Sequence, residues 1–243
     1  MKIKNLLKIF LVLIICSSCI SLSPRSFYRE FNCPENAQIK IENLNGSLEI
    51  MGWKKEKLEI KALKVGSSRR VRETDIEIKK TDKKLTIKTL PPSIHPEQVE
   101  VNYRLRLPEK IKLEEININQ GNVYLYQVYG EIILKINRGD IEIEDFSGYL
   151  QAMTGEGNIT VRIYEIKKND RIILETNEGD ILLFLPSLFN ARIKAVTRQG
   201  NIQGDIISAE ESTQLKEIDK KFGTGEGLIE LYSTNGNIKI YFL

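Results

Sequence analysis

The stretch Lys135–Asp145, KINRGDIEIED, places a glycine and an aspartate directly before an alternation of isoleucine and glutamate. Alternate residues of a β-strand point to the same face, so Ile141 and Ile143 would share one buried face. The tripeptide RGD at positions 138–140 is also one that many animal cell-adhesion receptors recognise. Whether it is a receptor ligand or a structural turn depends on whether the rest of the chain repeats it.

The pattern of a glycine, a small polar residue and alternating apolar residues recurs along the chain. Successive copies lie about 20 residues apart over much of the chain, which is the spacing of stacked repeat architectures. The position of Arg138 varies between copies, whereas the glycine and a following Asp or Asn are usually retained. We therefore interpret the tripeptide as a turn and not as a receptor motif. The copies have their glycines at Gly46, Gly121, Gly139, Gly157, Gly179, Gly200 and Gly236, with a degenerate copy at Gly227.

Each part of the repeat has a physical role. Glycine adopts positive φ without a Cβ clash, so the chain can turn sharply there. Asp or Asn accepts hydrogen bonds from nearby backbone N–H groups. Stacked copies would place neighbouring strands about 4.8 Å apart and align the Asx residues in a column. The sequence predicts an all-β fold that is a stacked, β-solenoid-like β-repeat over residues 111–243, with an N-terminal β-strand region over residues 37–110.

Two segments depart from this alternation. PPSIHPE, residues 91–97, is a Pro-rich break in which we expect His95 to be exposed. Ser208–Gly223 is charged and contains helix formers, so we expect a short helix or a mobile excursion.

Residues 1–18 have the layout of a secretory signal, with a lysine-rich start and an apolar run from Ile9 to Ile15. That run is too short to span a bilayer, which needs about 20 apolar residues, so a retained membrane helix is the weaker interpretation. Ser17 and Ser18 before Cys19 resemble the lipobox of bacterial lipoproteins, in which the cysteine is acylated. Cys16 departs from that pattern, and an ordinary cleaved signal with a free Cys19 is the alternative. Residues 19–36 would then be a tether.

The cysteines and the charge exclude several classes of protein. Only Cys19 and Cys33 follow the signal, so an acylated Cys19 leaves no disulfide partner for Cys33. One histidine and two spaced cysteines cannot hold zinc, and the frequent neutral Asn after the repeat glycine disfavours calcium. We expect no metal and no cofactor.

The charges of the exported chain balance. The whole chain carries 36 Lys and Arg against 33 Asp and Glu, and the signal contains three of the lysines and no acidic residue. Nucleic-acid binding usually needs a basic face, so we expect no nucleic-acid partner. Arg69, Arg70 and Arg72 form the one dense basic spot, which we interpret as a solvated loop.

The chain from Ala37 to Leu243 resembles the bacterial putative-adhesin family. The resemblance rests on the Gly-Asp/Asn-Ile repeats, on ILLFLPSLFNARIKAVTRQGNI at residues 181–202 and on the closing GTGEGLIELYSTNGNIKI at residues 223–240. It implies an all-β domain of unknown function, built from roughly 20-residue repeats and found in envelope or secreted proteins. It implies no set of catalytic residues.

Outward-facing positions of the repeat provide the candidate sites. Glu142 and Glu144 are a possible carboxylate pair, but they lie on one strand, whereas a glycosidase needs its carboxyl groups on either side of a bond in a cleft. We therefore expect no enzyme and no catalytic residues. A strip on the outer face could stack on sugars or pack against a partner, unless the N-terminal region or residues 208–223 cover it. The strip consists of Tyr124, Tyr126, Leu182 and Phe184.

The predicted function is a lipid-anchored cell-envelope binding or adhesion module, attached to the membrane through Cys19. A glycan or an envelope protein is its expected partner, and we expect a monomer. The alternative is a structural or stress-sensing component that binds another envelope protein. Ile20 and Ser21 carry no acidic retention signal, which by resemblance to lipoprotein sorting in two-membrane bacteria favours the outer membrane or cell surface.

Overall fold

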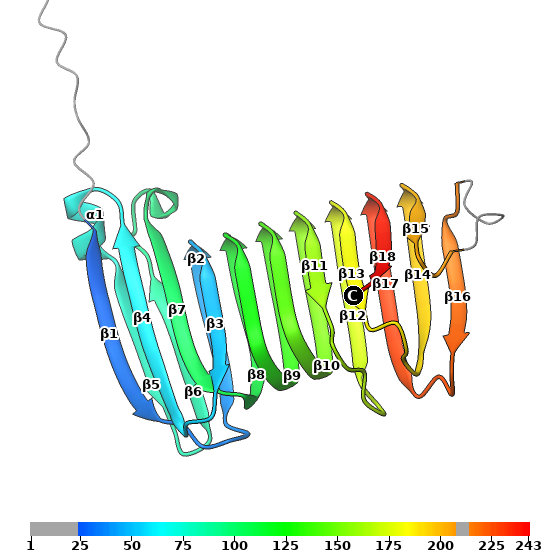
Figure 1. Cartoon of the computed structure of the whole chain (residues 1–243). Coiled ribbons are helices and arrows are strands. Elements are labelled where there is room, and N and C mark those ends of the chain that lie inside the picture. The colour runs from blue at the N-terminus through cyan, green and yellow to red at the C-terminus, as the bar shows by residue number, and fades with distance from the viewer. Residues whose placement is uncertain (1–23, 208–213) are drawn as a thin grey trace, which may run out of the picture.

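The computed structural model describes residues 24–207 and 214–243, which form an elongated stack of β-strands (Figure 1). The strands belong to one sheet that is folded into two facing layers. Strands β9 (Val123–Arg138) and β10 (Ile141–Glu156) contribute to both layers and bend where Gln127 and Asp145 adopt positive φ. The prediction of an all-β, stacked β-repeat with a β-solenoid-like architecture is confirmed.

The two layers are defined by the order in which their strands pair. Layer A runs through β1 (Arg25–Asn32), β4 (Lys57–Val65), β7 (Glu100–Pro108), β3 (Leu48–Trp53), the first parts of β9 and β10, β11 (Ile159–Arg162), β13 (Ile181–Leu185), β18 (Ile238–Phe242) and β15 (Ile202–Gly204). Layer B runs through β5 (Asp75–Lys80), β6 (Lys84–Leu90), β2 (Gln38–Asn45), β8 (Lys110–Gln120), the later parts of β9 and β10, β12 (Arg171–Glu178), β17 (Gly227–Asn235), β14 (Ala191–Gln199) and β16 (Glu217–Phe222). Among the described residues the helices are α1 (Ser68–Glu73) and the short 3-10 helix η1 (Pro96–Gln98).

The core lies between the layers and consists of aligned aliphatic columns. Ile141 pairs with Ile159, and Ile159 pairs with Ile181. The column continues through Ile238 to Ile202, and each of these five side chains is at most 1% exposed. The expected burial of the repeat isoleucines in adjoining layers is confirmed.

The order of units in the stack differs from their order in the chain. The terminal unit, β17 and β18, lies between the unit of β12 and β13 and the unit of β14 and β15. Likewise, β2 and β3 pair directly with β8 and β9. Residues 37–110 and 111–243, which the sequence divides into two regions, therefore form one continuous stack.

Three local expectations also differ from the structure. The segment 19–36 is not wholly a tether, because Arg25–Asn32 forms β1, whose Phe27 and Phe31 pack against the core. In Ser208–Gly223, Glu217–Phe222 is a strand paired with β14, and residues 208–213 lie outside the described residues. The basic spot lies on α1, where Arg69 pairs with Glu73 at 2.8 Å.

The predicted Asx column exists along one corner of the stack. The Asn122 carboxamide accepts a hydrogen bond from the backbone N–H of Asp140, and the Asp140 carboxylate accepts one from the N–H of Asn158, at 2.9 and 2.7 Å. The same contact continues through Asp180, Asn237 and Asn201 at 2.7 to 3.0 Å. Each unit therefore fixes the register of the next.

A column of glycines runs beside the Asx residues. Gly157 has φ +145°, and a Cβ built on it would lie closer than 3.0 Å to the backbone oxygen of Gly139 in the adjacent unit. The same overlap with the glycine carbonyl of the adjacent unit in the stack recurs at Gly121, Gly139, Gly179, Gly236 and Gly200. Buried hydroxyl groups three residues before several repeat glycines, such as Thr154 and Thr176, donate to the glycine carbonyls at 2.9 to 3.0 Å.

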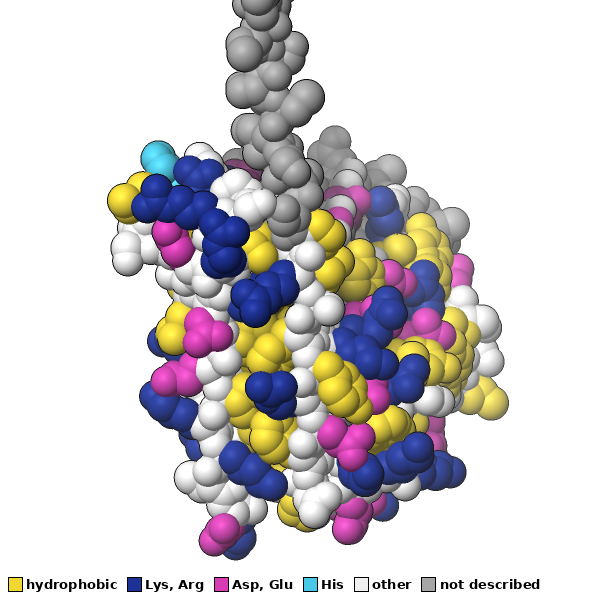
Figure 2. All heavy atoms as spheres, turned by 90° about the vertical axis from the view of Figure 1, so that its left-hand side faces the viewer, with side chains coloured by type: hydrophobic (Ala, Val, Ile, Leu, Met, Phe, Trp, Pro, Cys, Tyr) yellow, Lys and Arg dark blue, Asp and Glu magenta, His cyan; other side chains and the backbone are white. Residues whose placement is uncertain are grey.

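The end of the stack formed by β1 and β5 is partly covered by cations. Figure 2 shows apolar side chains between two edge strands, with Lys and Arg side chains lying over them. The Arg29 guanidinium lies 5.0 Å from the Phe27 ring centroid, and the Lys80 ammonium lies 5.8 Å from that of Phe31. Lys80 also donates to the backbone oxygen of Asn32 at 3.0 Å. Charges at a sheet edge oppose edge-to-edge aggregation.

The glycine column provides a test of the corner geometry. We expect Gly157→Ala to lower the free energy of unfolding by about 3 kcal/mol or more, because positive φ and overlap with a neighbouring backbone each cost about 1–3 kcal/mol. Gly225→Ala is the matched control, because Gly225 also has positive φ but faces the flexible Lys221 side chain. Urea unfolding measures both variants, and equal losses would contradict the proposed role of the column.

Candidate functional site

The four residues of the predicted strip all lie on the outer face of layer A. Tyr124 and Tyr126 on β9 are 42% and 40% exposed, so the described part of the chain leaves both rings accessible. Leu182 and Phe184 on β13 are partly exposed. They lie three strands from the tyrosines, or about 14 Å at the usual strand spacing. The structure does not bring the two pairs together, so the expectation of one continuous strip is wrong.

Polar side chains separate the two pairs. Glu142 on β10 and Thr160 on β11 lie between Tyr124 and Leu182 in the paired register. Glu142 forms an ion pair with Arg162 at 2.7 Å, and that guanidinium lies 5.0 Å from the ring centroid of Phe184. Glu144 accepts a hydrogen bond from Tyr164 at 2.7 Å. Both carboxylates of the candidate catalytic pair are therefore engaged by neighbouring side chains.

A groove of about 510 Å³ extends from Tyr124 toward the β1 end of layer A. Tyr28 on β1 and Leu63 on β4 contribute apolar surface at 48% and 42% exposure. Arg104, which pairs with Glu49 at 2.7 Å, adds charged groups to the lining. A smaller hollow of about 360 Å³ continues past Tyr124, and its lining includes Met51, Tyr126, Glu142 and Glu144.

The Tyr28 side chain is suited to stacking as a neutral phenol. A tyrosine hydroxyl is protonated at neutral pH, and partial desolvation and the nearby Glu30 carboxylate raise the pKa of Tyr28 further. The Lys61 ammonium lies 5.9 Å from the ring centroid. Sequence analysis missed this residue because Tyr28 falls in the segment interpreted as a tether.

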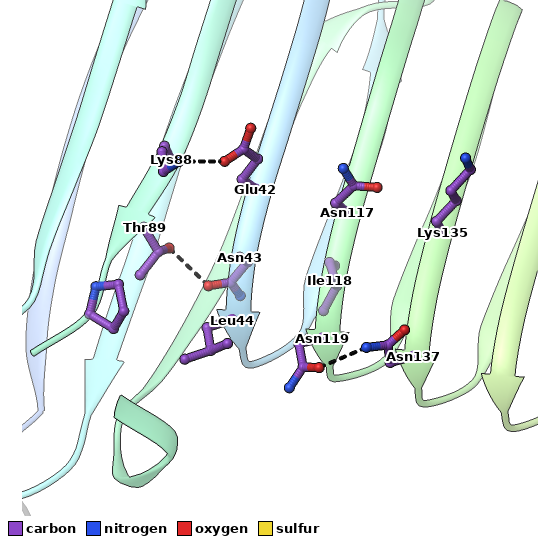
Figure 3. Close-up of a pocket in the computed structure, with 11 residues that line it drawn as sticks. Glu42, Asn43, Leu44, Lys88, Thr89, Asn117, Ile118, Asn119, Lys135 and Asn137 are labelled. Carbon is purple, nitrogen blue, oxygen red and sulfur yellow. Dashed lines mark hydrogen bonds and ion pairs between the residues drawn. The ribbon is translucent and has the colours of Figure 1, made fainter. Parts of the chain in front are cut away.

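A second hollow, of about 640 Å³, lies on the outer face of layer B (Figure 3). One row of its lining crosses four paired strands, from Lys88 on β6 through Glu42 and Asn117 to Lys135 on β9. Farther along the strands, the Asn137 carboxamide donates a hydrogen bond to that of Asn119 at 2.9 Å (Figure 3). The sequence contains a signal for these amides, since an Asn stands two residues before the repeat glycine in NQG and NRG.

The layer-B hollow exists because β6 and β2 separate. Their pairing ends at Glu42 and Lys88, and the next residue of β2, Asn43, turns its side chain inward. Its Nδ2 donates to the backbone oxygen of Val101 at 2.9 Å, and its Oδ1 accepts from Thr89 at 2.8 Å. Thr89 is also hydrogen-bonded to Tyr103, whose pKa burial raises to about 12. The base of the hollow is therefore a satisfied, buried hydrogen-bond network.

The family model described as Toastrack DUF4097 matches residues 38–241, which include the layer-B hollow and the layer-A groove except for its β1 side. The chain belongs to the Toastrack DUF4097 family. The resemblance to the bacterial putative-adhesin family is confirmed. No curated protein matches the chain.

Two solved structures are similar to this chain. A putative cell adhesion protein from Clostridium sporogenes is 18% identical, with 91% of this chain and 100% of that chain covered and a TM-score of 0.54. A putative adhesin from Bacteroides fragilis is 14% identical, with 89% and 97% covered and a TM-score of 0.42. At these identities the likeness to the Clostridium protein establishes a common fold and no common ligand.

Neither a metal centre nor a membrane span is found in the described part of the Toastrack chain. No three His, Cys, Asp or Glu side chains there are grouped so that they could hold a metal ion. No helix among the described residues is both long and apolar enough to cross a membrane. Cys19 and the predicted signal lie outside the described residues.

Cys33 is a buried free thiol, 4% exposed. Burial raises its pKa to about 11, so very little thiolate forms near neutral pH. We expect a thiol reagent at pH 8 to modify Cys33 at least about 100-fold more slowly in the folded protein than in urea, because the thiolate is the reactive form. Absorbance during modification measures the rates. Equal rates in the two states would contradict the assigned burial.

Proposed function

We propose that this chain is a lipid-anchored binding module of the bacterial cell envelope and that it has no catalytic activity. The observation that carries the proposal is the groove between Tyr28 and Tyr124, in which exposed rings lie on a rigid sheet. Tyrosine presents an apolar face together with a polar hydroxyl, and both groups suit the faces and hydroxyls of a sugar. A glycan of the envelope is therefore the proposed ligand.

The position of the anchor supports this function. The first described residue, Pro24, follows Cys19 by five positions, and an extended chain of that length spans at most about 18 Å. Strand β1 begins one residue later and carries Tyr28. An acylated Cys19 would therefore hold the β1 end of the stack, and the groove beside it, close to a membrane surface.

The anchor is tested by metabolic labelling with an alkynyl fatty acid. We expect Cys19→Ala to lose the label, because the thiol of Cys19 is the proposed site of acylation. Cys33→Ala is the matched control and should keep the label, since that thiol is buried. A label that persists in Cys19→Ala would refute acylation at this residue, and Cys16→Ala would then identify the site.

The groove is tested by removing its aromatic rings. We expect the double variant Tyr28→Ala and Tyr124→Ala to weaken binding to purified envelope polysaccharide at least about tenfold, because each ring contributes about 1 kcal/mol beyond its buried area. Isothermal titration calorimetry measures the affinity, and circular dichroism checks the fold. Phe184→Ala is the control, because that ring lies on the same face but packs beside Arg162 and Tyr241.

Three outcomes of the groove experiment separate the candidate functions. A loss of polysaccharide binding in the double variant alone supports the glycan-binding module. Unchanged polysaccharide binding in the double variant would show that the groove is not the binding site. An envelope protein that co-purifies from membranes with the wild type and not with the double variant would instead support the structural or stress-sensing role.

A further inference from the structure

The layer-B hollow offers hydrogen-bonding groups that the fold does not use. The Asn119 Oδ1 accepts from Asn137, and no hydrogen bond among the described residues uses the Asn119 Nδ2 or the Asn137 Oδ1. Asn117 donates to Glu115 at 2.8 Å, and its Oδ1 is similarly unused within the described part of the chain. Figure 3 shows these side chains on the neighbouring strands β8 and β9. An amide donor beside an amide acceptor matches two neighbouring hydroxyl groups of a sugar ring.

The charges of the layer-B hollow favour an acidic ligand. Glu42 is paired with Lys88 at 2.8 Å and with Lys40 at 3.0 Å. Hydrogen bonds from Lys88 and Lys40 lower the pKa of Glu42, so its negative charge is present and compensated. Lys135 forms no ion pair with any other described residue and lies at the same level of the sheet as Asn117. Among the described residues that line the hollow, the cation left for a ligand is therefore Lys135, which is paired in register with Asn117 and lies two residues before Asn137.

The shape of the hollow is fixed before a ligand arrives. Its volume of about 640 Å³ lies in the range of small-molecule sites, about 300–1,000 Å³. Its base is held by the buried network of Asn43, Thr89 and Tyr103. Except for Pro91, the lining side chains project from paired strands. A site that is already ordered loses less conformational entropy on binding.

We propose that the layer-B hollow binds an acidic saccharide, with a sugar carboxylate at Lys135 and neighbouring hydroxyl groups at Asn119 and Asn137. The site is separate from the tyrosine groove, because the two lie on the outer faces of different layers. It adds a second binding site to the module and does not depend on lipid anchoring or on the layer-A groove.

The test is isothermal titration calorimetry of the purified full chain with three probes. These are a short galacturonate oligomer, a galactose oligomer of equal length, and inorganic phosphate. We expect the wild type to bind the galacturonate oligomer most tightly, because only this probe has both carboxylates and ring hydroxyls. No binding of this oligomer, or phosphate binding that is at least as tight, would overturn the proposal.

Variants assign the two roles. Lys135→Ala should weaken galacturonate binding about fivefold, which is the effect of one exposed charge, and should leave any binding of the neutral oligomer unchanged. Asn119→Ala combined with Asn137→Ala should weaken both oligomers. Asn177→Ala is the matched control, because it removes an exposed amide from β12, two strands away from β9.

The remaining outcomes separate this site from the tyrosine groove. Loss of galacturonate binding in the Tyr28→Ala and Tyr124→Ala variant, with the hollow variants unaffected, would place the acidic ligand in layer A and refute the present assignment. An Asn177→Ala effect as large as that of the Asn119 and Asn137 variant would do the same, since it would indicate nonspecific attraction to layer B. Loss of galacturonate binding only in the Lys135 variant and in the Asn119 and Asn137 variant supports the proposal, regardless of what the layer-A groove binds.

Discussion

The close approach of glycine backbones at one corner is the constraint on which the stack depends. Six of the seven repeat glycines lie where a Cβ would overlap the carbonyl of a glycine in an adjacent unit, as Gly157 does with Gly139, and Gly46 instead approaches the carbonyl of Val101. The Asx side chain beside it reaches the backbone N–H of the following unit, so register and spacing are set at the same place. Because side chains alternate along a strand, a fixed register aligns the isoleucines of all units in one core.

The direction of strand pairing differs between the ends of the stack and its interior. Interior units pair in parallel, whereas toward the ends β1 with β4, β4 with β7, β5 with β6, and β14 with β16 pair antiparallel. The outermost strands β1, β5 and β16 do not belong to the glycine repeat, and their cations and bulky apolar residues cover surface that another unit would otherwise bury. Terminal elements of a repeat protein have to differ in this way, because each inner unit relies on its neighbours to bury its apolar face.

Core packing constrains the inward side chains, whereas the outward side chains differ from unit to unit. Most inward positions are aliphatic in every unit, while the outward positions of layer A change from tyrosine to glutamate to arginine across neighbouring strands. In layer A, exposed tyrosines therefore stand at the two ends of the groove, on β1 and β9, and in layer B amides stand on the neighbouring strands β8 and β9. Both hollows lie in the part of the stack nearest β1, where the units inserted from the N-terminal region meet the regular repeat.

The sequence by itself determined the repeat, the glycine and Asx corner and the aliphatic core, because all three follow from local periodicity and backbone stereochemistry. It also located Tyr124 and Tyr126 on an outer face. Tertiary structure alone decided which unit stacks on which, because copies with the same pattern can pair with any other copy. That order placed β17 and β18 between two earlier units, and it set Tyr28 and Tyr124 on the lining of one groove. Neighbours across strands depend on pairing between distant segments, which periodicity along the chain does not encode.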